Sequence, residues 1–119
     1  PALREFTAPT LNPPPSVASA EQIASGENLY MDHCWICHSD VGSGGRLARR
    51  GLFPELALSP TLNSPELFSA TVLDGIRSQN GMASFANILT PEGVEDVRAY
   101  LIERANVTLA AQQAREAQQ

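Results

Sequence analysis

The sequence DHCWICHSD, residues 32–40, contains both cysteines and both histidines of this 119-residue chain. Within it, Cys34, Cys37 and His38 form a C-x-x-C-H motif. Two thiols three residues apart can each add to a haem vinyl group, and a histidine directly after the second thiol can reach the iron from one side. The motif therefore indicates one covalently attached haem c.

Two other kinds of site remain open for the same residues. A thioredoxin-type dithiol would need a preceding strand and a βαβ context, and the sequence predicts neither. A structural zinc site would need four ligands, but apart from Cys34, Cys37 and His38 only the adjacent His33 is available. Haem attachment is the interpretation that the motif favours.

An electron-transfer haem needs a sixth iron ligand, commonly His or Met. The chain has two methionines. Met31 lies three residues before Cys34, so we expect it to be a core residue of the first helix. Met82 lies in the run RSQNGMASF, whose Gly, Asn and Ser residues indicate an irregular loop. We predict that His38 and Met82 ligate the iron, and that His33 lies at the surface.

Composition excludes several other functions. The formal net charge is −5, and all eight basic residues are arginines, which argues against a nucleic-acid surface. No apolar run is long enough for a membrane span. We find no phosphate-binding loop, no paired acid and base carboxylates and no activated serine, so no catalytic residue is predicted.

The chain divides into three predicted parts. Residues 1–18 contain five of the nine prolines and are expected to form an extended arm or linker. Residues 19–105 are expected to form one haem domain, and residues 106–119, which have little apolar content, a frayed tail. Because the chain begins with Pro1, we expect a processed chain or a fragment.

Three helices are predicted and no strand. Ser19, Ser64 and Thr90 are expected N-caps, because helical spacing of apolar residues follows each of them. The helices should run to about Met31, through residues 66–76, and to about residue 105. The middle helix should line the haem pocket with an apolar face, namely Leu67, Phe68, Thr71, Val72 and Ile76.

This order of helix, C-x-x-C-H motif, loop, middle helix, methionine loop and final helix resembles the class I cytochromes c over residues 19–104. The resemblance implies an all-α fold in which the N- and C-terminal helices cross at Gly26 and Tyr30, with Tyr100 pointing toward the crossing. It also implies that the Pro54 carbonyl accepts a hydrogen bond from the outer nitrogen of His38, with Pro60 as the alternative residue.

A more local resemblance involves residues 53–56 (FPEL), 72–85 and 89–105. These segments are similar to the C-terminal haem domain of quinohaemoprotein, PQQ-dependent alcohol dehydrogenases. The resemblance implies a periplasmic domain that takes single electrons from a PQQ dehydrogenase domain and passes them to a downstream acceptor. An independent soluble periplasmic carrier is the alternative. A haem sensor or peroxidase-like enzyme would require that Met82 does not bind the iron.

Overall fold

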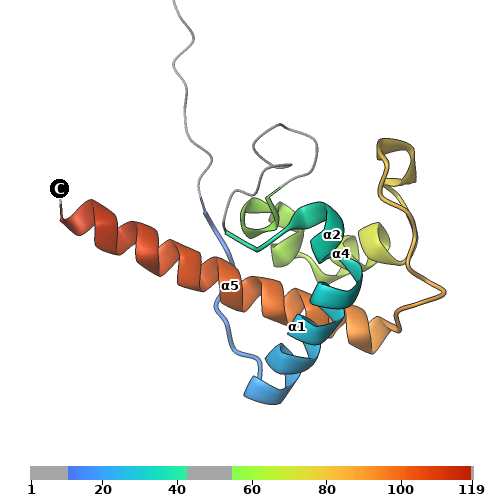
Figure 1. Cartoon of the computed structure of the whole chain (residues 1–119), viewed down its shortest axis with the longest axis horizontal. Coiled ribbons are helices and arrows are strands. Elements are labelled where there is room, and N and C mark those ends of the chain that lie inside the picture. Colours follow the sequence, from blue (N-terminus) through green and yellow to red (C-terminus); the bar gives the residue numbers. More distant parts are fainter. Residues whose placement is uncertain (1–10, 43–54, 119) are drawn as a thin grey trace, which may run out of the picture.

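The computed structural model describes residues 11–42 and 55–118, and within these ranges the chain is helical without strands (Figure 1). The two longer helices are α1 (Ala20–His33) and α5 (Pro91–Ala117). The shorter elements are α2 (Trp35–His38), η1 (Leu56–Leu58), η2 (Pro60–Asn63), α4 (Pro65–Val72) and η3 (Ser78–Asn80). The predicted all-α fold class is confirmed.

The three expected N-caps are present. In each, the hydroxyl oxygen accepts a hydrogen bond from the backbone N–H three residues later, which satisfies a donor that the first helical turn leaves unpaired. The pairs are Ser19 with Gln22 (3.1 Å), Ser64 with Leu67 (3.1 Å) and Thr90 with Gly93 (3.0 Å). The starts of α1, α4 and α5 therefore follow from local sequence.

Helices α1 and α5 cross in direct backbone contact at Gly26. A Cβ atom built on Gly26 would lie 1.9 Å from the carbonyl oxygen of Asp96, so only glycine fits there. One turn later Tyr30 packs against Tyr100, with ring centroids 5.5 Å apart and planes tilted by 47°. The predicted crossing at Gly26 and Tyr30 is confirmed.

The core lies between α5 and the shorter elements. One face of α5 is buried, and α5 packs against α1, α4, η1 and η2. The buried apolar residues of the core cluster are Tyr30, Val41, Ala57, Leu62, Phe68, Val72, Leu89, Val94, Val97, Tyr100, Leu101, Ile102 and Ala105. Burial of this apolar surface is the main force that holds the elements together.

The middle helix is shorter than expected. Helix α4 ends at Val72, because the chain turns at Gly75, where φ is +69°. Phe68 and Val72 are buried as expected, whereas Leu67 is 40% and Ile76 51% exposed.

Met31 was expected in the core, and this expectation was wrong. Its side chain is 43% exposed, because it lies away from the α1 face on which Gly26 and Tyr30 are buried.

The described part of the arm lies against the helices and does not extend away from them (Figure 1). The Asn63 side-chain amide donates to the Asn12 carbonyl at 3.1 Å, and the Asn106 amide donates to the Pro14 carbonyl at 2.9 Å. Leu11 packs against the core. At the other end, α5 continues without a break from the core to Ala117. The division at residues 18 and 105 stays a prediction.

Candidate functional site

The C-x-x-C-H motif forms a single helical turn directly after α1. The N–H of His38 donates to the carbonyl of Cys34 at 3.0 Å, and the N–H of Cys37 donates to the same oxygen at 3.2 Å. Both cysteines are free; Cys34 is partly buried and Cys37 is exposed. The His38 side chain is partly buried. The turn therefore brings two free thiols and an imidazole together, with Cys34 as the N-cap of α2 and Cys37 and His38 as its last two residues.

The environment of Cys34 keeps its thiol protonated. Burial, with a smaller contribution from the charge of the nearby Cys37, raises the pKa of Cys34 to about 11. A thiol with this pKa is mainly protonated near pH 7.

Met82 lies on a loop that returns to the end of α4. The loop follows η3, which is ended by Gly81 in the left-handed conformation, with φ +99°. The Met82 side chain is partly buried and packs against the same core cluster as Cys34. The irregular loop predicted around Met82 is confirmed. In the view of Figure 1, α2, α4 and η3 lie on the same side of α5.

Two hydrogen bonds fasten the Met82 loop to the last turn of α4. The hydroxyl of Ser84 donates to the carbonyl of Leu73 at 2.5 Å, and the N–H of Phe85 donates to the carbonyl of Val72 at 2.8 Å. From the sequence, Ser84 was expected only to favour a loop. Its position two residues after the candidate ligand was the sole sequence feature that could have identified it as an anchor.

The turn after His38 is also held by groups that the sequence analysis missed. The Tyr30 hydroxyl donates to the carbonyl of Ser39, and the Trp35 indole N–H donates to Asp40 at 2.9 Å. The Gly42 N–H donates to a carboxylate oxygen of Glu55 at 2.8 Å. Three hydrogen bonds thus fix the segment that immediately follows the candidate ligand.

Three further residues were named in the predictions for the haem site: Pro54, Pro60 and His33. Pro54 lies outside the described residues, so its proposed hydrogen bond to His38 is untested. Pro60, the alternative, begins η2 and is exposed. His33 ends α1 and is partly buried.

The donor atoms fit a covalent haem better than a bare metal ion. Across residues 11–42 and 55–118, no three His, Cys, Asp or Glu side chains are grouped so that they could hold a metal. Two free thiols on one turn suit thioether bonds to haem, while an imidazole and a thioether are common axial ligands of haem iron. Cys34, Cys37, His38 and Met82 would hold such a group.

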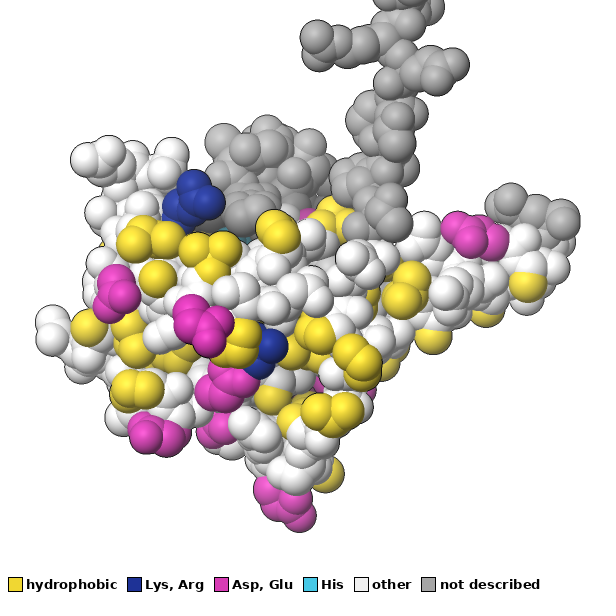
Figure 2. Space-filling view, turned by 180° about the vertical axis from the view of Figure 1, so that it is seen from behind, with side chains coloured by type: hydrophobic (Ala, Val, Ile, Leu, Met, Phe, Trp, Pro, Cys, Tyr) yellow, Lys and Arg dark blue, Asp and Glu magenta, His cyan; other side chains and the backbone are white. Residues whose placement is uncertain are grey.

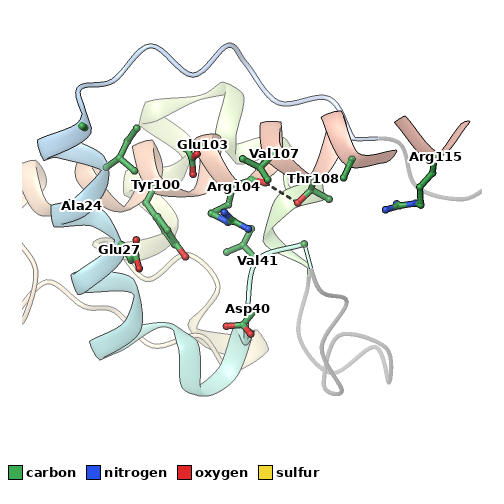
Figure 3. Close-up of a pocket in the computed structure, with 14 residues that line it drawn as sticks. Ala24, Glu27, Asp40, Val41, Tyr100, Glu103, Arg104, Val107, Thr108 and Arg115 are labelled. Carbon is green, nitrogen blue, oxygen red and sulfur yellow. Dashed lines mark hydrogen bonds between the residues drawn. The ribbon is translucent and has the colours of Figure 1, made fainter. Parts of the chain in front are cut away.

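A separate groove of about 950 Å³ opens between α1, residues 40–42 and the distal half of α5 (Figure 3). Its charged side chains have both signs, and they are Glu27, Asp40, Glu103, Arg104 and Arg115. The Thr108 hydroxyl that lines it donates to the Arg104 carbonyl at 2.9 Å. None of the four candidate site residues lines this groove, so it is distinct from the candidate site.

The surface carries few basic groups. Figure 2 shows one face, on which apolar and acidic side chains alternate and arginines are sparse. This agrees with the net charge of −5 and with the absence of lysine. No helix in the described ranges is both long and apolar enough to cross a membrane.

The chain matches a known protein family over most of its length. The family model described as "Cytochrome C oxidase, cbb3-type, subunit III" covers residues 21–101, which include Cys34, Cys37, His38 and Met82.

Curated relatives fall into two groups. The quinohemoprotein alcohol dehydrogenase ADH IIB of Pseudomonas putida is 36% identical over 92 residues, and the dehydrogenase subunit of the alcohol dehydrogenase (quinone) of Acetobacter aceti is 32% identical over 95 residues. These alignments cover 77% and 80% of this chain, but it spans only 12% of each dehydrogenase. A cytochrome c6-like protein of Nostoc sp. is 32% identical over 102 residues, with 84% of both chains covered.

Proposed function

This chain belongs to the cbb3-type subunit III family of c-type cytochromes, and on that premise we propose that it transfers single electrons through one haem c with His38 and Met82 as axial ligands. The observation that supports this most directly is that the candidate haem-attachment turn and the candidate methionine ligand lie on separate elements that pack against one core. The turn of α2 offers Cys34, Cys37 and His38, and a loop beyond α4 offers a partly buried Met82 that packs against the same core as Cys34.

The chain's own residues would act by holding both axial positions. When bound, the haem supplies an iron that changes between its ferrous and ferric states. A methionine ligand favours the ferrous state and raises the reduction potential relative to two histidines. If His38 and Met82 both hold the group, no coordination position is left for a substrate. We therefore propose electron transfer without turnover of a substrate and assign no catalytic residue.

The electron donor is proposed from the relatives. The similarity to part of a quinohemoprotein alcohol dehydrogenase and of an alcohol dehydrogenase (quinone) supports a PQQ-dependent dehydrogenase domain as donor, a separate downstream acceptor and a periplasmic location. The similarity to a cytochrome c6-like protein over nearly its whole length supports the alternative, an independent carrier. In either case we propose that the Pro54 carbonyl accepts a hydrogen bond from the outer nitrogen of His38.

The axial assignment can be tested with the two methionines as a matched pair. We expect purified, haem-loaded protein to show sharp reduced c-type bands and, when oxidised, the weak far-red band of an iron–sulfur ligand bond. Met82→Ala should retain the haem but lose the far-red band, lower the potential and bind cyanide. Met31→Ala, at the exposed methionine, should keep all of these properties. A far-red band that persists in Met82→Ala would rule out Met82 as the ligand.

The two donor arrangements can be distinguished by kinetics. Rapid mixing of the oxidised chain with a PQQ dehydrogenase that lacks its haem domain, in the presence of alcohol, should reduce the haem quickly if that domain is its donor. Reduction no faster than that of an unrelated c-type cytochrome would favour the independent carrier.

A further inference from the structure

The residue after the candidate iron ligand adopts a backbone conformation that side chains disfavour. Ser39 has φ +62° and ψ −166°, in a region populated almost entirely by glycine. Among the described residues it is the one non-glycine with positive φ. Such a conformation persists only where surrounding contacts hold it.

A buried hydroxyl holds this residue. The Tyr30 hydroxyl donates a hydrogen bond to the Ser39 carbonyl, and the Tyr30 side chain has no exposed surface. Burial raises the pKa of Tyr30 well above its ordinary value, so the hydroxyl keeps its proton as a donor. The ring itself is fixed by its packing against Tyr100 at the crossing of α1 and α5.

Other contacts hold the turn on either side of this bond, including the one from the Trp35 indole to Asp40. On the helix side, the Ser39 N–H donates to the Trp35 carbonyl at 2.7 Å. Farther along, Glu55 accepts from the N–H groups of Gly42 at 2.8 Å and Ala57 at 3.1 Å. The bond from Tyr30 acts between them, on the Ser39–Asp40 peptide unit, one peptide unit beyond His38.

We propose that Tyr30 is a positioning residue for His38, whose hydroxyl fixes the Ser39 carbonyl and thereby the backbone and ring plane of the histidine that ligates the iron. The inference rests on the proposed function, because it requires His38 to be an axial ligand. It links the packed helix crossing to the geometry of the iron site through a single hydrogen bond. Tyr30 does not touch the reacting atoms and acts only through Ser39 and His38.

The test compares two tyrosine-to-phenylalanine variants of the haem-loaded protein. Tyr30→Phe keeps the ring in the crossing and removes the hydroxyl that Ser39 uses. Tyr100→Phe keeps the same ring pair and serves as the matched control. Two readouts are measured: the haem-methyl proton shifts of the ferric protein, which respond to the plane of the axial ligand, and amide hydrogen exchange at residues 39–42.

We expect Tyr30→Phe to alter the haem-methyl pattern and to accelerate exchange at residues 39–42 roughly tenfold, as expected when a partly buried carbonyl loses its hydrogen bond. Tyr100→Phe should leave both unchanged. Adding Ser39→Gly to Tyr30→Phe should restore both toward wild type, since glycine adopts this backbone without the hydroxyl's help. Ser39→Gly alone keeps the bond from Tyr30 and should keep the wild-type pattern.

If the haem-methyl shifts are unchanged in Tyr30→Phe, or change equally in Tyr100→Phe, the inference is overturned while the electron-transfer proposal remains intact. A wild-type protein without histidine–methionine signatures would instead overturn the proposed function, and the inference with it.

Discussion

Gly26→Ala tests whether α1 and α5 touch at the backbone. The added methyl group would meet the Asp96 carbonyl oxygen at 1.9 Å and the carbonyl carbon at 2.5 Å. Ordinary contact begins at 3.4 Å, so the two helices would have to separate by about 1.5 Å. Both obstacles are backbone atoms, which cannot move aside as the end of a flexible side chain can.

The expected cost combines two opposing effects. Overpacking of a well-packed contact costs roughly 1–3 kcal/mol, and a backbone obstacle places this variant near about 3 kcal/mol. Alanine is better than glycine inside a helix by about 1 kcal/mol, which offsets part of the loss. The net destabilisation should therefore be about 2 kcal/mol, or a decrease in Tm of about 10 °C for a domain of this size.

Gly93→Ala is the matched control, because it also adds a methyl group to a helical glycine. Its nearest neighbours are a terminal methyl group of Leu29 and the Thr90 hydroxyl, both at 3.3 Å, so little needs to move. Thermal unfolding of the haem-loaded proteins, followed by far-UV circular dichroism, should show an unchanged or higher Tm for Gly93→Ala. A Gly26→Ala protein as stable as Gly93→Ala would refute the close crossing.

Three further changes have defined outcomes. Cys37→Ala should remove one thioether and cripple covalent attachment, so that acidified acetone extracts haem from the variant; undiminished attachment would contradict the haem assignment of the motif. Ser84→Ala should loosen the Met82 loop, because the bond to Leu73 is lost, and the far-red band should disappear roughly 5–10 °C earlier on heating. Burial raises the pKa of Tyr30, so folding favours the protonated hydroxyl. The contribution of this hydroxyl to the free energy of unfolding is complete below about pH 10 and decreases as pH rises further, by up to about 1.4 kcal/mol per pH unit. Tm measured between pH 9 and 11 should therefore fall more steeply in wild type than in Tyr30→Phe, and equal slopes would count against this coupling.

The helix starts could be predicted because their determinants are local. An N-cap hydroxyl bonds to an N–H only three residues away, so Ser19, Ser64 and Thr90 were recognisable from neighbouring residues. The same holds for the motif at Cys34 and Cys37, in which the spacing itself defines one helical turn. The crossing at Gly26 came from the family resemblance, since nothing local shows which helix will pack there.

The supports of the candidate site could not be predicted in this way. The hydroxyl of Ser84 bonds to Leu73, eleven residues earlier in the chain, and the Glu55 carboxylate bonds to Gly42, thirteen residues earlier. A serine or a glutamate is compatible with any loop, and its partner is decided only when the helices have packed. The prediction that Met31 lies in the core was wrong because helical spacing alone did not decide which face of α1 its side chain would occupy.

The C-terminal part of α5 shows that amino-acid composition does not predict where a helix ends. Residues 106–119 were expected to fray because they offer little apolar surface to bury. Yet alanine, glutamine, arginine and glutamate are good helix formers, and this stretch follows a helix that the core already holds. Extending an existing helix does not require the costly first turn that an isolated helix of this length would need. Beyond Thr108 the helix has little burial, and its bonds are local, such as Gln112 to Glu116 at 3.3 Å. Low hydrophobicity therefore carried no information about where the helix ends.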